Sequence, residues 1–157
     1  MKIYIGTDHA GYETKEKLKS FLIDLGHEVI DKGPTSFDIN DDYPDYIKPV
    51  AEAVSQDKDS RGIILGASGQ GEAMCANRVS GVRAGLFYGK PPKNQTDASG
   101  HVLNMIASTR MHNNANVLSL GMRFISFEEA KEAVRIFLET EFSGDPRHIR
   151  RIKKLDY

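Results

Sequence analysis

The sequence predicts an α/β fold with a mostly parallel sheet, and two observations carry this prediction. Short apolar segments with strand character alternate with segments of helical periodicity. Each apolar segment closes on glycine or polar residues, as buried strands commonly do. The five expected strands are Lys2–Thr7, His27–Asp31, Gly62–Gly66, Val82–Phe87 and Asn116–Gly121. Because these segments are mostly apolar, we expect the sheet to be buried on both faces.

The first expected helix lies between the first two strands. Its apolar residues Leu18, Phe21, Leu22 and Leu25 fall at i, i+3, i+4 and i+7, which places them on one helix face. Gly26 follows, where a glycine commonly ends a helix. This spacing indicates a helix that packs its apolar face on the sheet.

Three later helices are marked by their start signals. Pro44 opens one whose apolar residues repeat the same spacing, and Ser126 with Glu129 forms a capping box before another. Asp145 and Pro146 are typical of a cap and first turn of a last helix. That helix is strongly cationic, with Arg147, Arg150, Arg151, Lys153 and Lys154.

Two segments, 32–45 and 88–100, lack regular periodicity and are expected to be loops. Neither has the length or composition of an interdomain linker. The chain has 157 residues, and one domain corresponds to roughly 150 residues. We therefore expect a single domain over residues 1–157.

Composition and charge exclude several classes of protein. Apolar residues make up 39% and charged residues 27%, which excludes wholesale disorder. The 21 basic residues against 22 acidic ones give a net charge of −1, so no global basic field exists for nucleic acid or an anionic membrane. The amino terminus enters the first strand directly, which favours a cytoplasmic location. The single cysteine, Cys75, excludes an internal disulfide and a multi-cysteine zinc site.

The strongest local signal is the glycine-rich segment that follows the third strand. Gly66, Gly69 and Gly71 allow a close backbone approach, and their amides can converge on an oxyanion near a helix start. The segment lacks the Lys-Ser/Thr pair of a Walker A loop and the spacing of a dinucleotide fingerprint, so a nucleotide site is disfavoured. A tight turn without a ligand is the competing interpretation.

Glu72, at the end of this segment, is the candidate base. A carboxylate beside oxyanion-holding amides can remove a proton α to a carbonyl, although a first-turn glutamate also suits the helix dipole without any chemistry. Asp8 and His112 are further candidates with ordinary alternatives as capping or surface residues. The cluster of Arg147, Arg150 and Arg151 is typical of a solvated helix face, yet arginine side chains also bind phosphate monoesters bidentately.

Six motifs in order resemble one known family. They are Gly6-Thr7-Asp8-His9-Ala10-Gly11, Asp42-Tyr43-Pro44, Gly66-Ala67-Ser68-Gly69-Gln70-Gly71-Glu72, Ala76-Asn77-Arg78, His112-Asn113-Asn114-Ala115-Asn116-Val117-Leu118 and Arg147-His148-Ile149-Arg150-Arg151. The chain is similar to the B-type ribose-5-phosphate isomerases, which are grouped with allose-6-phosphate and galactose-6-phosphate isomerases. The resemblance covers nearly the whole chain.

The resemblance implies a three-layer α/β/α Rossmann-like sandwich with a five-stranded parallel sheet. It implies strand order 2-1-3-5-4, whereas the default from the residues alone is 2-1-3-4-5. It also implies a homodimer or a dimer of dimers with shared sites, a sugar-phosphate substrate, and isomerisation of ribose 5-phosphate to ribulose 5-phosphate through a cis-enediolate. No cofactor or metal is implied.

The resemblance also implies residue roles. Asp8 and His112 match the pair that opens the furanose ring, and Ser68 matches a hydroxyl that moves protons between oxygens. The phosphate ligands would be His9, Arg123, Arg147 and Arg151, part of them from a neighbouring subunit. The amides of Gly69, Gln70 and Gly71 and the side chain of Asn113 would hold the enediolate, and Tyr43 would line the sugar site.

Members of the family use one of two bases, and the sequence distinguishes them. One branch has a cysteine immediately before the glycine loop, where this chain has Gly66. The other has a glutamate just after the loop, where this chain has Glu72. The chain therefore resembles the glutamate branch, and Cys75 is expected to be a core residue.

The chain departs from the family pattern by a probable insertion near residues 89–100. Loops at strand ends often shape specificity, so this segment could redirect the enzyme to another sugar phosphate or have no role. The alternatives to the ribose isomerase are therefore an isomerase of a hexose 6-phosphate, of allose or galactose type, and a sugar-phosphate binding module without catalysis. A flavodoxin-like FMN protein fits only the coarse strand pattern.

Overall fold

The computed structural model describes residues 1–91, 93, 95–96, 100 and 102–155. Five strands form one parallel sheet: β1 (Lys2–Thr7), β2 (Glu28–Asp31), β3 (Arg61–Gly66), β4 (Ala84–Phe87) and β7 (Val117–Gly121). The helices are η1, a 3-10 turn (His9–Gly11), α1 (Tyr12–Asp24), α2 (Pro44–Gln56), α3 (Gln70–Ala76), α4 (Met105–Asn113), α5 (Phe127–Glu139) and α6 (Pro146–Ile152). A separate two-stranded hairpin pairs β5 (Gln95–Thr96) with β6 (Val102–Leu103).

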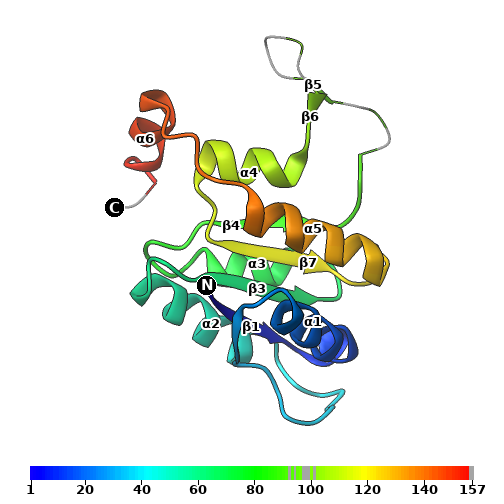
Figure 1. Ribbon diagram of the computed structural model, residues 1–157. Coiled ribbons are helices and arrows are strands. Elements are labelled where there is room, and N and C mark those ends of the chain that lie inside the picture. Colours follow the sequence, from blue (N-terminus) through cyan, green and yellow to red (C-terminus); the bar gives the residue numbers. More distant parts are fainter. Residues whose placement is uncertain (92, 94, 97–99, 101, 156–157) are drawn as a thin grey trace.

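The sheet has the order β2-β1-β3-β7-β4, and every neighbouring pair is parallel (Figure 1). Counted along the chain, this is the order 2-1-3-5-4 that the family resemblance implied. The default order 2-1-3-4-5 is wrong because the chain leaves β4 at the sheet edge, forms α4, and returns between β3 and β4.

Helices cover both faces of the sheet, as the apolar strands require. Ile63 and Leu65 of β3 pack into one core with α1, α4 and α5, whereas Ile64 between them packs into a second core with α2 and α3. Side chains alternate across a strand, so both cores draw on the same strand. The predicted burial on both faces and the three-layer α/β/α Rossmann-like architecture are confirmed.

The predicted helix ends are observed with their hydrogen bonds. Gly26 follows α1 with a φ of +82°, a left-handed conformation that favours glycine. The Ser126 hydroxyl accepts from the Glu129 N–H, and the Ser126 N–H donates to the Glu129 carboxylate at 2.8 Å. Asp145 caps α6 by accepting from the Arg147 N–H at 2.8 Å.

Helix α4, the 3-10 turn η1 and the β5–β6 hairpin escaped prediction. Helix α4 has no apolar stripe, and its start at Asn104 is marked only by one side chain that accepts from two backbone N–H groups. The expected loop 88–100 is wrong at Gln95–Thr96, because strands of two residues carry no readable periodicity. Within the segment 89–100, residues 92, 94 and 97–99 lie outside the described residues, and its status as an insertion stays a prediction.

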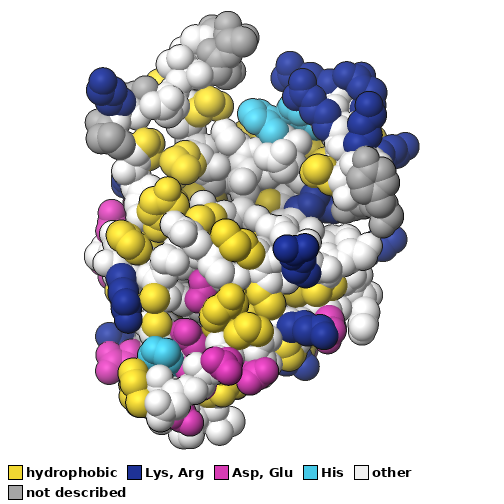
Figure 2. Space-filling model, turned by 180° about the vertical axis from the view of Figure 1, so that it is seen from behind, with side chains coloured by type: hydrophobic (Ala, Val, Ile, Leu, Met, Phe, Trp, Pro, Cys, Tyr) yellow, Lys and Arg dark blue, Asp and Glu magenta, His cyan; other side chains and the backbone are white. Residues whose placement is uncertain are grey.

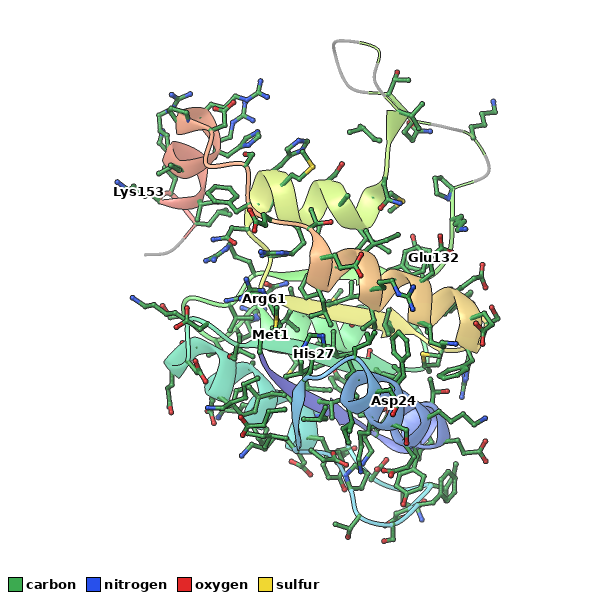
Figure 3. All side chains as sticks on the ribbon, in the orientation of Figure 1. Met1, Asp24, His27, Arg61, Glu132 and Lys153 are labelled. Atoms are coloured by element: carbon green, nitrogen blue, oxygen red, sulfur yellow. The ribbon has the colours of Figure 1, made fainter. Side chains whose placement is uncertain are left out.

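Because the strands of the sheet run parallel, their amino ends all lie on one side of the sheet and their carboxyl ends on the opposite side. We call these two sides the amino edge and the carboxyl edge. Met1 and Arg61, at the amino ends of β1 and β3, lie at one edge, and Lys153 after α6 lies on the same side of the view (Figure 3). The loops that leave β1, β3 and β7 lie at the opposite, carboxyl edge. No helix among the described residues is long and apolar enough to cross a membrane.

Candidate active site

Three loops meet at the carboxyl edge of the sheet. They leave β1, β3 and β7, which are neighbours in the sheet, with Thr7 opposite Leu65 and Gly66 opposite Gly121. Ligands of open parallel sheets bind beyond the carboxyl ends of the strands. This edge is therefore the candidate active site.

Hydrogen bonds from one side chain and two backbone N–H groups tie the glycine loop to β7 and the residues after it. The Ser119 hydroxyl donates to the Gly69 carbonyl at 2.7 Å, and the Met122 and Arg123 N–H groups donate to the Gly66 and Ala67 carbonyls at 2.9 and 3.0 Å. Gly69 has a φ of +73°, which a side chain would oppose. The Gly66, Ala67 and Gly69 carbonyls are thereby occupied. The first-turn amides of α3 lack intrahelical acceptors, so they can donate to groups outside the helix, as the Gln70 N–H does to Ser68, or to an oxyanion.

Glu72 projects from the first turn of α3 and is buried, with 5% of its surface exposed. Burial raises the pKa of its carboxyl, its own backbone N–H opposes this rise, and the nearby Asp8 carboxylate adds to it. The Glu72 carboxylate fills the space in which a Cβ on Gly66 would stand. The absence of a side chain at Gly66 therefore allows the acid to lie over the end of β3.

Asp8 lies at the end of β1 and is also buried. Its carboxylate accepts from the Ala10 N–H at 3.0 Å and so caps η1. Burial raises the pKa of the Asp8 carboxyl despite that hydrogen bond. The capping role and a chemical role are thus compatible at this residue.

Two further predicted residues border the glycine loop. A Cβ on Gly71 would stand 2.9 Å from the Tyr43 hydroxyl, so the Tyr43 ring lies against the loop. The Ser68 hydroxyl accepts from the Gln70 N–H at 3.3 Å. Arg123 is exposed just after β7, and its N–H is the one bonded to Ala67.

His9 pairs with Asp41, a residue of the 32–43 loop to which the sequence analysis gave no role. His9 Nδ1 lies 2.7 Å from Asp41 Oδ1. Among the described residues, Asp8, His9 and Asp41 are the one group whose potential metal-ligating atoms all lie within 4.8 Å of one another. The one available sequence signal was the place of Asp41 directly before the Asp42-Tyr43-Pro44 motif.

The remaining predicted residues lie at the amino edge. His112 lies in the last turn of α4 and packs against His148 of α6, with ring centroids 4.6 Å apart and ring planes tilted by 44°. Asn113, the last residue of α4, lines a hollow with Ala84, at the start of β4. Arg147 and Arg151 extend from α6 and are exposed. In Figure 2, Lys and Arg side chains gather at one end of the molecule beside histidine, and acidic side chains gather at the other.

One chain therefore holds the predicted site in two separate groups. The carboxyl-edge group contains Asp8, His9, Tyr43, Ser68, Gly69, Gln70, Gly71, Glu72 and Arg123. The amino-edge group contains His112, Asn113, Arg147 and Arg151. The five residues of β7 separate them by about 16 Å along the strand. Asp8 and His112, expected to act as a pair, are not brought together within the chain.

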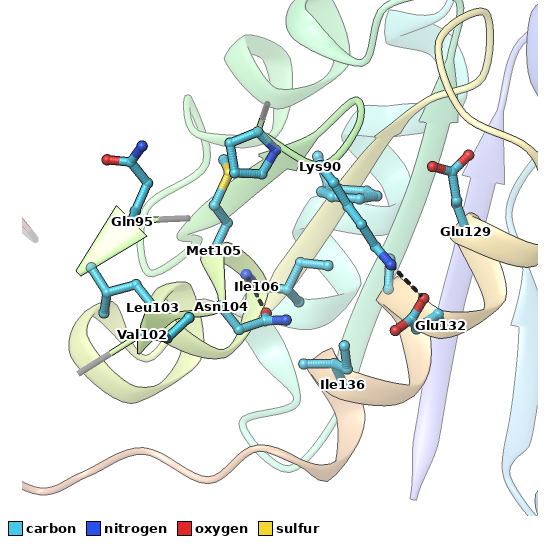
Figure 4. A pocket seen from close by; sticks show the side chains of 13 residues that line it. Lys90, Gln95, Val102, Leu103, Asn104, Met105, Ile106, Glu129, Glu132 and Ile136 are labelled. Atoms are coloured by element: carbon cyan, nitrogen blue, oxygen red, sulfur yellow. Dashed lines mark hydrogen bonds and ion pairs between the residues drawn. The ribbon is translucent and has the colours of Figure 1, made fainter. Parts of the chain in front are cut away.

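A pocket of about 360 Å³ lies apart from both groups (Figure 4). It is formed by the hairpin, α4 and α5, and Lys90 bridges its rim to Glu132 at 3.1 Å. Its lining includes Leu103, Met105 and Ile136 but none of the predicted site residues. It is therefore not the candidate active site.

A comparison with models of known families shows which family this chain belongs to. The ribose/galactose isomerase model matches residues 3–155. The chain belongs to this family. The resemblance drawn from the six motifs is thereby confirmed.

Individual isomerases of this family match over nearly their full length. Ribose-5-phosphate isomerase B of Mycolicibacterium paratuberculosis is 38% identical over 152 residues, which cover 97% of this chain and 87% of that protein. The solved Mycoplasma genitalium enzyme, with bound ribulose 5-phosphate, has a TM-score of 0.84 and 37% identity, covering 98% of this chain and 93% of that one. The Thermotoga maritima enzyme has a TM-score of 0.83 and 41% identity, covering 99% and 97%.

Proposed function

We propose that the protein interconverts ribose 5-phosphate and ribulose 5-phosphate through a cis-enediolate, with Glu72 as the base. The observation that carries this proposal is the buried Glu72 carboxyl beside the glycine loop, in a chain of the ribose/galactose isomerase family. Its raised pKa makes the carboxylate a stronger base than an exposed glutamate. Relatives named for this reaction match over nearly the whole chain.

The reaction requires a proton to leave one carbon and return to its neighbour. Asp8 and His112 first open the furanose ring by proton transfer. Glu72 then takes the C2 proton, the C2–H electrons form the C1–C2 double bond, and the negative charge moves to O1. The amides of Gly69, Gln70 and Gly71, with the Asn113 side chain, stabilise that charge.

Collapse of the enediolate gives the ketose. Ser68 moves the O2 proton to O1, the C2 carbonyl forms, and Glu72 returns its proton to C1. His9, Arg123, Arg147 and Arg151 bind the phosphate, while Tyr43 lines the sugar site. C1 is reduced as C2 is oxidised within one molecule, so the net oxidation state is unchanged and the reaction needs no external oxidant or reductant. The proposal includes no cofactor or metal.

We expect purified protein to convert ribose 5-phosphate to ribulose 5-phosphate. In deuterated water, the ribulose 5-phosphate should acquire deuterium at C1, because an acid-base carboxyl exchanges its proton with solvent during some turnovers. Allose 6-phosphate and galactose 6-phosphate serve as comparison substrates. A higher kcat/KM for either hexose phosphate, or binding without turnover of all three, would contradict the proposed substrate.

We further propose that a second copy completes each site. The two groups of residues lie at opposite edges of one sheet, so the amino-edge group of one copy must meet the carboxyl-edge group of another. The flank along α3 and β4 suits this contact because it exposes Met74 and Tyr88 beside Gln70. It continues through Asn77 to the hollow lined by Asn113. Such a two-fold contact would form a homodimer, the unit from which a dimer of dimers is built.

Mixing two inactive variants tests the shared site. Glu72→Gln and His112→Ala should each be inactive, whereas mixed dimers contain one intact site of two. Since half of the dimers are mixed at random exchange, roughly a quarter of wild-type activity should return. As a control, Glu72→Gln mixed with Asp8→Asn, both from the carboxyl-edge group, should restore nothing. If both mixtures recover the same activity, or neither recovers any, the active site is not shared between two copies.

The cytoplasmic location and the lack of nucleic-acid or membrane partners stay predictions.

A further inference from the structure

The hydrogen bonds between Asp41 and His9 join the 32–43 loop to η1, and the two residues are 32 positions apart in the sequence. Asp41 Oδ1 accepts from the His9 backbone N–H at 3.1 Å and lies 2.7 Å from His9 Nδ1. One carboxylate oxygen therefore fixes both the main chain and the ring of His9. The 32–43 loop between β2 and α2 thus contributes to the carboxyl edge of the sheet.

The pair is largely withdrawn from water. The Asp41 side chain is 5% exposed and the His9 side chain 22%. Among the described residues, Asp41 Oδ2 is the buried side-chain oxygen without a hydrogen-bond partner. A buried carboxylate is costly unless it is paired, so the bonds to His9 matter more here than they would in an exposed ion pair.

The 2.7 Å contact between His9 Nδ1 and Asp41 Oδ1 determines which nitrogen of the His9 ring is left to bind a ligand. A carboxylate has no proton to donate, so Nδ1 carries the proton and donates it to Asp41. Nε2 is then the ring nitrogen that remains for a ligand. Phe37 of the same loop meets the His9 ring edge-on, with centroids 6.3 Å apart and planes at 85°, and this contact further limits the rotation of the ring.

The same atoms fit a hydrogen bond better than a shared metal ion. A separation of 2.7 Å is normal for a charge-assisted hydrogen bond. Two ligands of one tetrahedral zinc ion, each about 2.05 Å from the metal, stand about 3.3 Å apart. The proximity of Asp41 to His9 is therefore explained without a metal.

We propose that Asp41 is a positioning residue that holds the His9 imidazole with Nδ1 occupied and Nε2 presented to the phosphate group of the substrate. This inference rests on the proposed function, in which His9 binds the phosphate. Asp41 acts through His9 and does not itself touch the substrate. Outer partners that orient an imidazole typically change ligand affinity 10-fold to 100-fold when they are removed from metal sites.

Steady-state kinetics with ribose 5-phosphate separates positioning from catalysis. Asp41→Ala should raise KM about 10-fold with little change in kcat, because a contact to the unreacting phosphate acts equally in the ground and transition states. Asp41→Asn keeps an oxygen that accepts both bonds and should recover most of the affinity. Asp38→Ala, which removes an exposed carboxylate of the same loop, is the matched control and should leave both constants unchanged.

A double-variant cycle shows whether Asp41 acts through His9. In the His9→Ala background, Asp41→Ala should raise KM no further. An equal rise in both backgrounds would overturn the proposal. So would a loss of activity on dialysis against EDTA that added Zn²⁺ restores, since the cluster would then be a metal site.

A spectroscopic readout on the free protein is independent of turnover. Long-range ¹H–¹⁵N correlation spectra should show His9 protonated at Nδ1 in the wild type, and added inorganic phosphate should perturb Nε2. In Asp41→Ala the Nδ1 signal should change, whereas Asp41→Asn, which keeps the accepting oxygen, should leave His9 protonated at Nδ1. An unchanged signal in folded Asp41→Ala, or loss of the Nδ1 proton in Asp41→Asn, would overturn the inference. If the wild type is active and Asp41→Ala has an unaltered KM, the inference about Asp41 is wrong and the proposed function stands. If the wild type is inactive but the spectra are as expected, only the proposed function is wrong.

Discussion

Glu72→Gln is expected to lower kcat about 10³-fold while the substrate still binds, because a glutamine amide cannot accept the C2 proton. Steady-state kinetics on ribose 5-phosphate, with binding measured by calorimetry, would give both quantities. Glu52→Gln, at an exposed glutamate of α2, is the matched control and should retain full activity. Undiminished turnover by Glu72→Gln would remove Glu72 from the role of base.

The raised pKa of Glu72 also affects how the activity of the wild type, and the difference in stability between wild type and Glu72→Gln, depend on pH. The wild-type kcat/KM should fall on the acid side at a pH above the ordinary glutamate pKa of about 4.3, because the base must be ionised. Burial favours the protonated carboxyl in the folded state, so the ionised Glu72 lowers wild-type stability as pH rises through its folded pKa. Glu72→Gln should therefore have a higher Tm than wild type near neutral pH. The difference should vanish below about pH 4, where the carboxyl is protonated in both states.

Gly66→Ala is expected to lower kcat about 10²-fold without unfolding the protein. The added Cβ would occupy the space of the Glu72 carboxylate, so the acid must swing away from the end of β3. Displacement of a catalytic group by about 1 Å can cost this much. Gly66→Cys should displace Glu72 in the same way, because its Cβ would meet the same carboxylate.

The control for Gly66→Ala is the same change in a chain that already lacks the base. In the Glu72→Gln background, Gly66→Ala should lower the residual rate little further, since the group it displaces is already inactive. Circular dichroism should show the same secondary structure in all four proteins. A full additional loss in the double variant would mean that Gly66 matters for the loop itself rather than for the position of Glu72.

The parts of the fold that were predictable depend on local signals. The apolar strands, the Ser126–Glu129 capping box, the Pro44 start of α2 and the positive φ at Gly26 all follow from residues close in sequence. Helix α4 was missed because its one strong marker is the Asn104 cap. The sheet order needed the family resemblance, because the residues alone do not say that β7 enters between β3 and β4.

Candidate site residues could be proposed from the sequence, but their arrangement could not. Glu72 was identified from its place after a glycine loop, yet its burial and its contact with the Gly66 position depend on tertiary packing. The Asp41–His9 pair joins residues distant in sequence, and no spacing rule predicts it. The position of His112 at the amino edge follows from α4, the helix that the sequence did not reveal.

The division of the site between two edges of one sheet affects how the protein would behave at low abundance. Under the proposed sharing of sites, a single chain carries both groups of residues but no complete site, so dilution that separates the subunits should reduce turnover per chain. Cellular output would then rise more steeply than linearly with the amount of protein made. A modest fall in expression would diminish flux by more than its own proportion.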